Sequence, residues 1–425
     1  MTSARLVYAD ATGQIYDHPY LEMTGASGGS WQRVAESHLI PLPPGSELFL
    51  LPNRLPVGYD RSERRFLKLE EDPNNPKQMV QAVAAFMAPA HTQIFTAAYQ
   101  SEENAPVLPL FSYTAVGWKG GQFLAAGLRI DPLPRQDIDQ FDLDKLETRA
   151  KEALAHQRHN RLIQHLGTCA LSYGCPAAKN YFLGRWEAPL PTSPQCNADC
   201  LGCISLQEDS QVCASQERIT FVPTPEEIAE VAVEHLRRAD EPIVSFGQGC
   251  EGEPLLQGKI LTAAIDLIRR QTGRGTINLN TNGSMPRTVA QLRDSGLDAI
   301  RVSLNSARED YYRKYYKPRG YSFADVENSL RAMKTGGGFV SINLLNLPGV
   351  TDEEEEVETI IRLIDETGID LIQMRNINID PEWYLKGIGY RSRGQRLGVL
   401  EMIERIRHAH PQVKFGYFNP CLNPG

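Results

Sequence analysis

Residues 193–207 read SPQCNADCLGCISLQ and place three cysteines, Cys196, Cys200 and Cys203, within eight positions. A closed structural zinc site needs four ligands, usually supplied as paired short spacings, and only three thiols are local here. Three thiolates on a four-iron, four-sulfur cluster instead leave one iron without a protein ligand and open to a small molecule. The spacing therefore favours a catalytic iron-sulfur cluster over the alternative, a structural zinc ion with Cys213 as the fourth ligand.

From about residue 185 onward, the chain around this stretch alternates short apolar runs with helical patterns. Such alternation produces parallel strands with helical crossovers, and about six repeats favour an incomplete barrel over an open doubly wound sheet. We therefore predict an α/β fold, a partial (β/α)6 TIM-like barrel, with its chemistry at the carboxyl ends of the strands. The predicted strands are 187–193, 243–249, 276–283, 299–306, 340–349, 371–378 and 413–420. The predicted helices are 224–238, 257–271, 286–295, 323–335, 353–367 and 395–409.

The residues before the barrel follow a different pattern. Short apolar runs between turns predict a smaller mixed, β-rich domain, with a hairpin at Gly120-Gly121 and a helix at about 84–98. Apolar positions near a 3.6-residue period predict one helix over 142–167, with Asp142 as its cap. The predicted domains are an accessory domain at 1–140, a helical bridge at 141–184 and the barrel at 185–425.

Composition sets broad limits on the class of protein. The 425 residues are 41% hydrophobic and 23% charged, which is typical of a folded globular chain. The N-terminal stretch is polar and acidic where a secretory signal needs an apolar core, and no apolar run approaches membrane-spanning length. We expect a cytoplasmic protein that does not bind membranes. The net charge of -8 argues against general nucleic-acid binding.

The order of the motifs after the three cysteines is specific. A Gly-Glu-Pro sequence at 252–254 follows the second predicted strand, and Thr-Asn-Gly at 281–283 ends the third. Together with the Cys-x3-Cys-x2-Cys spacing after a first strand, this order resembles the radical S-adenosylmethionine (radical SAM) enzymes. The resemblance covers about residues 185–420 and does not extend to 1–165.

The resemblance implies a [4Fe-4S] cluster on Cys196, Cys200 and Cys203, and S-adenosylmethionine as the cosubstrate. It implies that Glu253 and nearby backbone receive the amino group of the cosubstrate, which pairs an acidic group with an amine. Polar groups after the fourth strand would hold ribose or carboxylate, and groups on the fifth and sixth would approach the adenine. The implied cosubstrate contacts are Gly252, Glu253, Pro254, Asn282, Ser303, Asn305, Gly349 and Met374.

The implied reaction is the reductive cleavage of S-adenosylmethionine to a 5'-deoxyadenosyl radical, which abstracts hydrogen from a substrate. The cofactor supplies the difficult chemistry, while the protein orients it and excludes water. The substrate predicted here is an unidentified protein, peptide or small molecule, and the electron donor is a protein such as flavodoxin or ferredoxin.

Other cysteines lie close to the predicted mouth of the barrel. Cytosolic thiols near a cluster are oxidation liabilities unless they are buried or ligated. We therefore predict a second iron-sulfur cluster on Cys169, Cys175, Cys213 and Cys250. The alternative is that two or three of these thiols are ordinary core residues, as we expect for Cys421.

Two further stretches carry charge. The sequence DYYRKYYKPRGY at 310–321 mixes tyrosines with basic residues, which suits either RNA contact or a structural lid. RNA is the less favoured partner because the chain is acidic. Two alternative functions nevertheless stay open. One is an RNA-modifying enzyme of the same family (methylation or sulfur insertion), and the other is a non-catalytic zinc or iron-sulfur protein. The acidic run 353–356 begins a predicted helix and is expected to complement its dipole.

Overall fold

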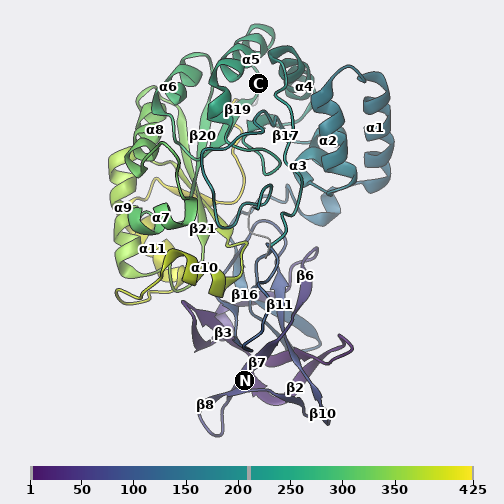
Figure 1. Cartoon of the computed structure of the whole chain (residues 1–425), viewed down its shortest axis with the longest axis vertical. Coiled ribbons are helices and arrows are strands. Elements are labelled where there is room, and N and C mark those ends of the chain that lie inside the picture. Colours follow the sequence, from purple (N-terminus) through teal and green to yellow (C-terminus); the bar gives the residue numbers. More distant parts are fainter. Residues whose placement is uncertain (1–2, 208–211, 424–425) are drawn as a thin grey trace.

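The computed structural model describes residues 3–207 and 212–423 and has two stacked lobes (Figure 1). The larger lobe is built on a curled, parallel half-barrel sheet whose strands follow one another in chain order. This confirms the predicted fold class, and the α/β alternation extends to the end of the described chain. The strands are β17 (Glu187–Pro189), β18 (Ile243–Phe246), β19 (Thr276–Thr281), β20 (Ala299–Leu304), β21 (Phe339–Asn346), β22 (Leu371–Asn376) and β23 (Lys414–Gly416).

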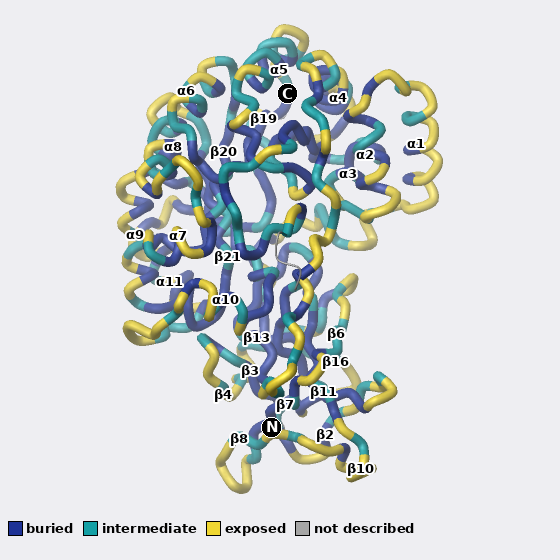
Figure 2. Tube along the Cα trace, in the orientation of Figure 1, coloured by how far each residue is buried: buried dark blue, intermediate teal, exposed yellow. Residues whose placement is uncertain are grey.

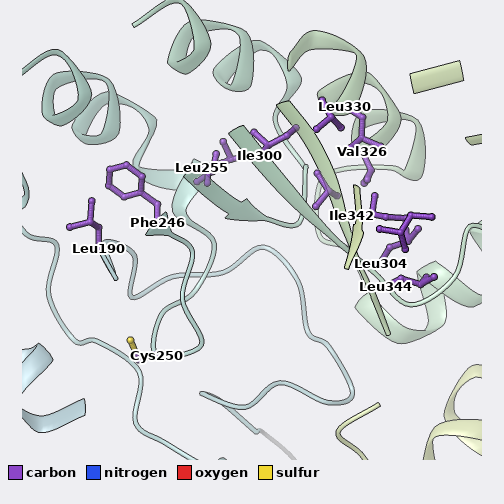
Figure 3. Close-up of a cluster of buried hydrophobic side chains, with 14 of the residues drawn as sticks. Leu190, Phe246, Cys250, Leu255, Ile300, Leu304, Val326, Leu330, Ile342 and Leu344 are labelled. Atoms are coloured by element: carbon purple, nitrogen blue, oxygen red, sulfur yellow. The ribbon is translucent and has the colours of Figure 1, made fainter. Parts of the chain in front are cut away.

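Helices cover the outer face of this sheet (Figure 1). The apolar side chains of the strands that point outward, such as Ile300 and Ile342, are fully buried and pack with Val326 and Leu330 of the covering helices (Figure 3). No helix in the described residues is long and apolar enough to cross a membrane. The helices of this lobe are α4 (Pro225–Arg238), α5 (Gly258–Gln271), α6 (Pro286–Asp294), α7 (Glu309–Tyr316), α8 (Phe323–Thr335), α9 (Glu354–Thr367), α10 (Pro381–Ile388) and α11 (Val399–Ala409).

Three helices precede β17, namely α1 (Leu143–His156), α2 (Arg161–Leu171) and α3 (Pro176–Leu183). Asp142 caps α1 as predicted, because its carboxylate accepts from the backbone amide of Lys145. The prediction of a single helix over 142–167 is wrong. Asn160 caps a second helix with its side-chain oxygen, so the chain turns at 157–160 and the two helices pack on each other.

The smaller lobe is β-rich, and most of its strands join one antiparallel sheet. The hairpin at Gly120-Gly121 is confirmed: it joins β15 to β16, and both glycines have positive φ. The predicted helix at 84–98 is wrong, because these residues supply β11, β12 and β13. The alanine-rich run 81–86 pairs with β6 along its length, so tertiary pairing overrides its helix propensity.

The strands of this lobe are β1 (Arg5–Ala9), β2 (Ile15–Glu22), β3 (Thr24–Ser27), β4 (Ser30–Arg33), β5 (Leu39–Pro41), β6 (Glu47–Leu51), β7 (Arg54–Asp60), β8 (Arg65–Lys68), β9 (Glu71–Asp72), β10 (Asn75–Met79), β11 (Gln81–Phe86), β12 (His91–Gln93), β13 (Thr96–Ala97), β14 (Tyr99–Ser101), β15 (Val116–Lys119) and β16 (Gln122–Arg129).

The two lobes meet at the carboxyl ends of β21 and β22. Asn346 and Asn376, the last residues of those strands, exchange hydrogen bonds of 2.7 to 3.1 Å with Gln93 and its neighbours on β12. An ion pair of 2.8 Å between Arg54 and Asp380 is buried in the same interface. Figure 2 shows buried, dark blue segments of both lobes where the lobes meet. The smaller lobe therefore closes one side of the end of the barrel where parallel strands place their chemistry.

Candidate active site

A pocket of about 320 Å³ opens at the carboxyl ends of the strands, within the size range of small-molecule sites. The three predicted cluster cysteines lie in its wall, on the loop that follows β17. The structure therefore places the Cys-x3-Cys-x2-Cys loop at the carboxyl ends of the half-barrel strands. Predicted residues that line the pocket are Cys196, Cys200, Cys203, Gly252, Glu253, Pro254, Asn282 and Ser303.

Helix α7 holds the cysteine loop from behind. The backbone amides of Asp199 and Leu201 donate to the carbonyls of Tyr316 and Tyr315, at 2.9 and 3.0 Å. All four tyrosines of this helix are buried, so they have no open ring face on which a base could stack. The tyrosines of α7 therefore support the loop, whereas the basic residues of the stretch 310–321 stay exposed.

Glu253 joins the ends of β18 and β19. Its carboxylate accepts from the hydroxyl of Thr281 at 2.5 Å, from the amide of Asn282 at 2.8 Å and from the amide of Leu255 at 3.0 Å. Burial raises its pKa to about 7, although these donors oppose the shift. A carboxylate has about four acceptor positions and three are used, so one is left for a donor in the pocket.

Glu251 is a residue that sequence reasoning missed. One of its carboxylate oxygens accepts from the amides of Gly247 and Gln248, and the other accepts from the amides of Thr192 and Ser193. It is buried, and burial raises its pKa. Glu251 thus ties the loop after β18 to the chain just before the cysteine loop. Its place between Cys250 and Gly252 was the only signal in the sequence.

Arginines in the pocket were also missed. Arg301 lies two residues before Ser303 on β20, so both side chains point to the same face. The Nε atom of Arg301 is buried without a partner, as are side-chain atoms of Asn280 and Asn343, which also line the pocket. Burial and the nearby Arg375 lower the pKa of Arg301. The sequence did contain a signal for Arg301: side chains two positions apart on a strand share a face, and Arg301 lies two positions before the predicted contact Ser303.

The structure places three predicted cosubstrate contacts outside the pocket lining. Asn305 is buried and donates to the hydroxyl of Tyr384 at 3.1 Å. Gly349 packs on Gly28 of the smaller lobe so tightly that an added Cβ would lie 2.0 Å from the Gly28 nitrogen. Met374 is fully buried in the core cluster. Each lies within four positions of a lining residue (Ser303, Leu345 or Asn378), an offset that strand prediction does not resolve.

The remaining cysteines separate into two groups. Cys169 and Cys250 are buried, and their sulfurs lie with a nitrogen of His165 in a set whose atoms are all within 4.8 Å of one another. Hydrogen bonding with Cys250 and His165 lowers the pKa of Cys169. Cys175 adjoins this set, since its amide donates to the carbonyl of Cys169 at 2.9 Å. Cys213, in contrast, is exposed, and no contact joins it to these residues within the described chain.

Comparison with known proteins agrees with this geometry. Residues 190–364 match the family model of the radical SAM superfamily. A probable GTP 3',8-cyclase from Methanocaldococcus jannaschii is 29% identical over 183 residues, which cover 40% of this chain and 55% of that protein. The GTP 3',8-cyclase from Alkaliphilus oremlandii is 27% identical over 192 residues, 44% of this chain and 56% of that protein. The chain spans only about half the length of these curated relatives.

Among solved structures, the crystal structure of methylornithine synthase has a TM-score of 0.39 and 19% identity, and covers 65% of this chain and 75% of that chain. The sequence match and the thiol-lined pocket define the class: residues 190–364 form a radical SAM domain, and this protein is an enzyme. Members of the superfamily use a [4Fe-4S] cluster, S-adenosylmethionine and an electron donor.

The residues present fit these groups. Three thiols, the ligand type of such clusters, converge on one pocket, and buried polar atoms without protein partners face it. When bound, the cluster supplies the electron that cleaves S-adenosylmethionine.

Proposed function

We propose that Cys196, Cys200 and Cys203 hold the cluster and that the free acceptor position of Glu253 receives the amino group of S-adenosylmethionine. The carboxylate lies at the pocket wall beside Gly252 and Pro254, on the side where the cysteine loop meets β18. Asn282 and Ser303, on the next two strands, extend the same polar wall toward the cosubstrate. The tethers from Thr281 and Asn282 hold the carboxylate in position before any ligand binds.

We further propose that the substrate is a small anionic molecule held in the floor of the pocket. The observation that carries this proposal is Arg301, whose only side-chain partner in the described residues is the neutral amide of Gln373, at 2.9 Å. No ion pair with a carboxylate involves Arg301 in those residues. Among the residues that the structure describes, Glu187 is the one carboxylate that raises the pKa of this buried guanidinium, but it makes no direct ion pair with it, and a phosphate or carboxylate from a substrate would supply one. Arg218, which lines the same pocket beside Cys203, adds a second positive charge.

GTP is the first substrate to test. The curated relatives are named as GTP 3',8-cyclases, and a nucleoside triphosphate meets the requirement for an anion. Because the chain matches only part of those proteins, the name supports GTP as a candidate and the arginines support its chemical class. The physiological electron donor would be a flavodoxin or a ferredoxin.

The test uses the full chain, reconstituted with iron and sulfide without oxygen and supplied with a strong reductant and S-adenosylmethionine. Release of 5'-deoxyadenosine is measured with and without GTP. We expect slow release without GTP and a several-fold increase with it. Absence of both binding and stimulation by GTP would exclude it as the substrate.

Arg301→Gln tests the anion site itself. Loss of a charge-assisted hydrogen bond of about 2 kcal/mol should raise the KM for the anionic substrate about 30-fold. Arg270→Gln is the matched control, since Arg270 lies exposed on α5 and, among the described residues, bonds only to a backbone carbonyl of its own helix. If Arg301→Gln instead weakens S-adenosylmethionine and leaves the substrate unaffected, the arginine belongs to the cosubstrate site.

A further inference from the structure

The set formed by His165, Cys169 and Cys250 has no part in the proposed reaction. His165 and Cys169 are one turn apart on α2, and Cys250 comes from the loop after β18, 81 positions later in the chain than Cys169. Figure 3 shows Cys250 on that loop, at the edge of the main cluster of buried apolar side chains, to which Cys169 also belongs. We propose that these residues, with Cys175 as the fourth ligand, bind a single thiophilic metal ion of the zinc class.

The spacing of the donor atoms argues for one ion. In a tetrahedral zinc site with Zn-S of about 2.3 Å and Zn-N of about 2.0 Å, two sulfurs lie about 3.8 Å apart and a sulfur and a nitrogen about 3.5 Å apart. The sulfur of Cys169 lies 3.5 Å from Nε2 of His165, and all three donor atoms lie within 4.8 Å of one another. The distances match ligands that share one ion.

The signature thiols (Cys196, Cys200 and Cys203) provide an internal comparison. In the part of the chain that the structure describes, they do not form a set with all ligand atoms within 4.8 Å. A [4Fe-4S] cluster places each thiolate outside a different corner of a cube, so its ligands stand further apart than those of one ion. The same fold thus holds one wide group of thiols and one tight group.

Cys175 completes the donor set better than Cys213 does. The sulfur of Cys175 lies outside the 4.8 Å set, so it would have to move closer to bind the ion, but it interacts electrostatically with both Cys169 and Cys250, and its backbone amide is bonded to Cys169. Three cysteines and one histidine are a common structural zinc set. The second iron-sulfur cluster predicted from the sequence included Cys213, which is exposed, and omitted His165. The proposed ion therefore replaces that cluster.

The ion would act as a positioning element for the active site. Glu251, the residue after Cys250, is tethered to Thr192 and Ser193, and Glu253 follows two positions later. The carbonyl of Cys250 also accepts from the amide of Ile219 at 2.8 Å. An ion shared by α2 and Cys250 would hold this loop against the helices. The expected effect of the ion on the binding of S-adenosylmethionine rests on the proposed function of Glu253. The presence of the ion in the site does not depend on that proposal.

The first experiment leaves the proposed site intact. The triple variant Cys196→Ala, Cys200→Ala and Cys203→Ala, in the full chain, is purified without oxygen and its zinc, iron and sulfide are measured. We expect one zinc ion per chain and no iron. Replacement of the ion with Co²⁺ should give the intense visible bands of a tetrahedral site with thiolate ligands.

Two results would overturn the proposal. A triple variant with about four iron and four sulfide per chain would show a second cluster, and one with no bound metal would show an empty thiol group. The proposed ligands are unaltered in this variant, and a thermal unfolding transition like that of the wild type would show that it is folded.

Single variants then identify the ligands. Cys169→Ser should lose the zinc, whereas Cys213→Ser and Cys421→Ser should retain it. His165→Cys keeps four donors and should retain the metal with a shifted Co²⁺ spectrum. When Cys196, Cys200 and Cys203 are unchanged, loss of zinc should weaken the binding of S-adenosylmethionine, while the four irons of the signature cluster remain. Retention of zinc in Cys169→Ser, or its loss in Cys213→Ser, would contradict the ligand assignment.

Discussion

The signature thiols and the His165 set differ in how the chain assembles them. The signature thiols come from one loop, eight residues long, so their spacing is visible in the sequence and their function follows from a motif. The His165 set joins α2 to the loop after β18, and only folding brings it together. A local motif suits a cofactor that must keep one open position, while a site made from distant segments can fix those segments relative to each other.

The largest expected effect separates the two groups directly. Cys200→Ala removes one of the three proposed cluster ligands from the pocket wall, so cleavage of S-adenosylmethionine should fall below detection. Zinc should remain at one per chain. The measurement is 5'-deoxyadenosine release together with iron and zinc analysis, and Cys421→Ala serves as the control with wild-type activity. Retained cleavage in Cys200→Ala would remove the signature loop from the mechanism.

Glu251→Ala should damage both groups, because this carboxylate lies between them. Its removal leaves the buried amides of Thr192, Ser193, Gly247 and Gln248 without an acceptor, at a cost of about 3 kcal/mol or more in the free energy of unfolding. Thermal unfolding and metal analysis should show lower stability and reduced iron and zinc together. Loss of one metal with full retention of the other would show that the two groups are not linked through Glu251.

The pH dependence of S-adenosylmethionine binding tests the proposed contact of Glu253 in the pocket that the signature thiols line. Because burial raises the pKa of Glu253 to about 7, the carboxylate is mostly ionised at pH 8 and mostly protonated at pH 6. A protonated carboxyl is a poorer acceptor for the amino group, so affinity for S-adenosylmethionine should fall about tenfold per unit below pH 7. Calorimetry at pH 6, 7 and 8 measures this change. Glu253→Gln should bind weakly at pH 8 and show a shallower slope, and equal slopes would assign the titration to another group.

The smallest expected effect concerns the outer edge of the cysteine loop. Arg319 donates to the carbonyl of Cys196 at 3.2 Å from an exposed position, and water can replace it there. Arg319→Ala should therefore change 5'-deoxyadenosine release by no more than about threefold and leave the zinc content unaltered. A loss as large as that of Cys200→Ala would mean that this contact, and not the buried α7 backbone, holds the loop.

Much of the barrel was predictable because its signals are local. Alternating apolar runs located all seven strands, and Asp142 was recognised as a helix cap. The errors occurred where tertiary contacts compete with local preference. The acidic run 353–356 does begin a helix as expected, but nothing in the sequence indicated that Glu353 and Glu356 are also buried against Arg308, with ion pairs of 3.2 and 2.8 Å.

By itself, the sequence determined the class of enzyme, because the three cysteines and the motifs that follow them lie on successive strand ends in a fixed order. The tertiary structure alone decided which residues surround that motif. It brought Arg301 into the pocket, moved Asn305, Gly349 and Met374 away from its lining, and joined His165 to Cys250. The reason is physical: a motif records neighbours along the chain, while a binding site is made of side chains that share a face, and a shift of one residue on a strand reverses that face.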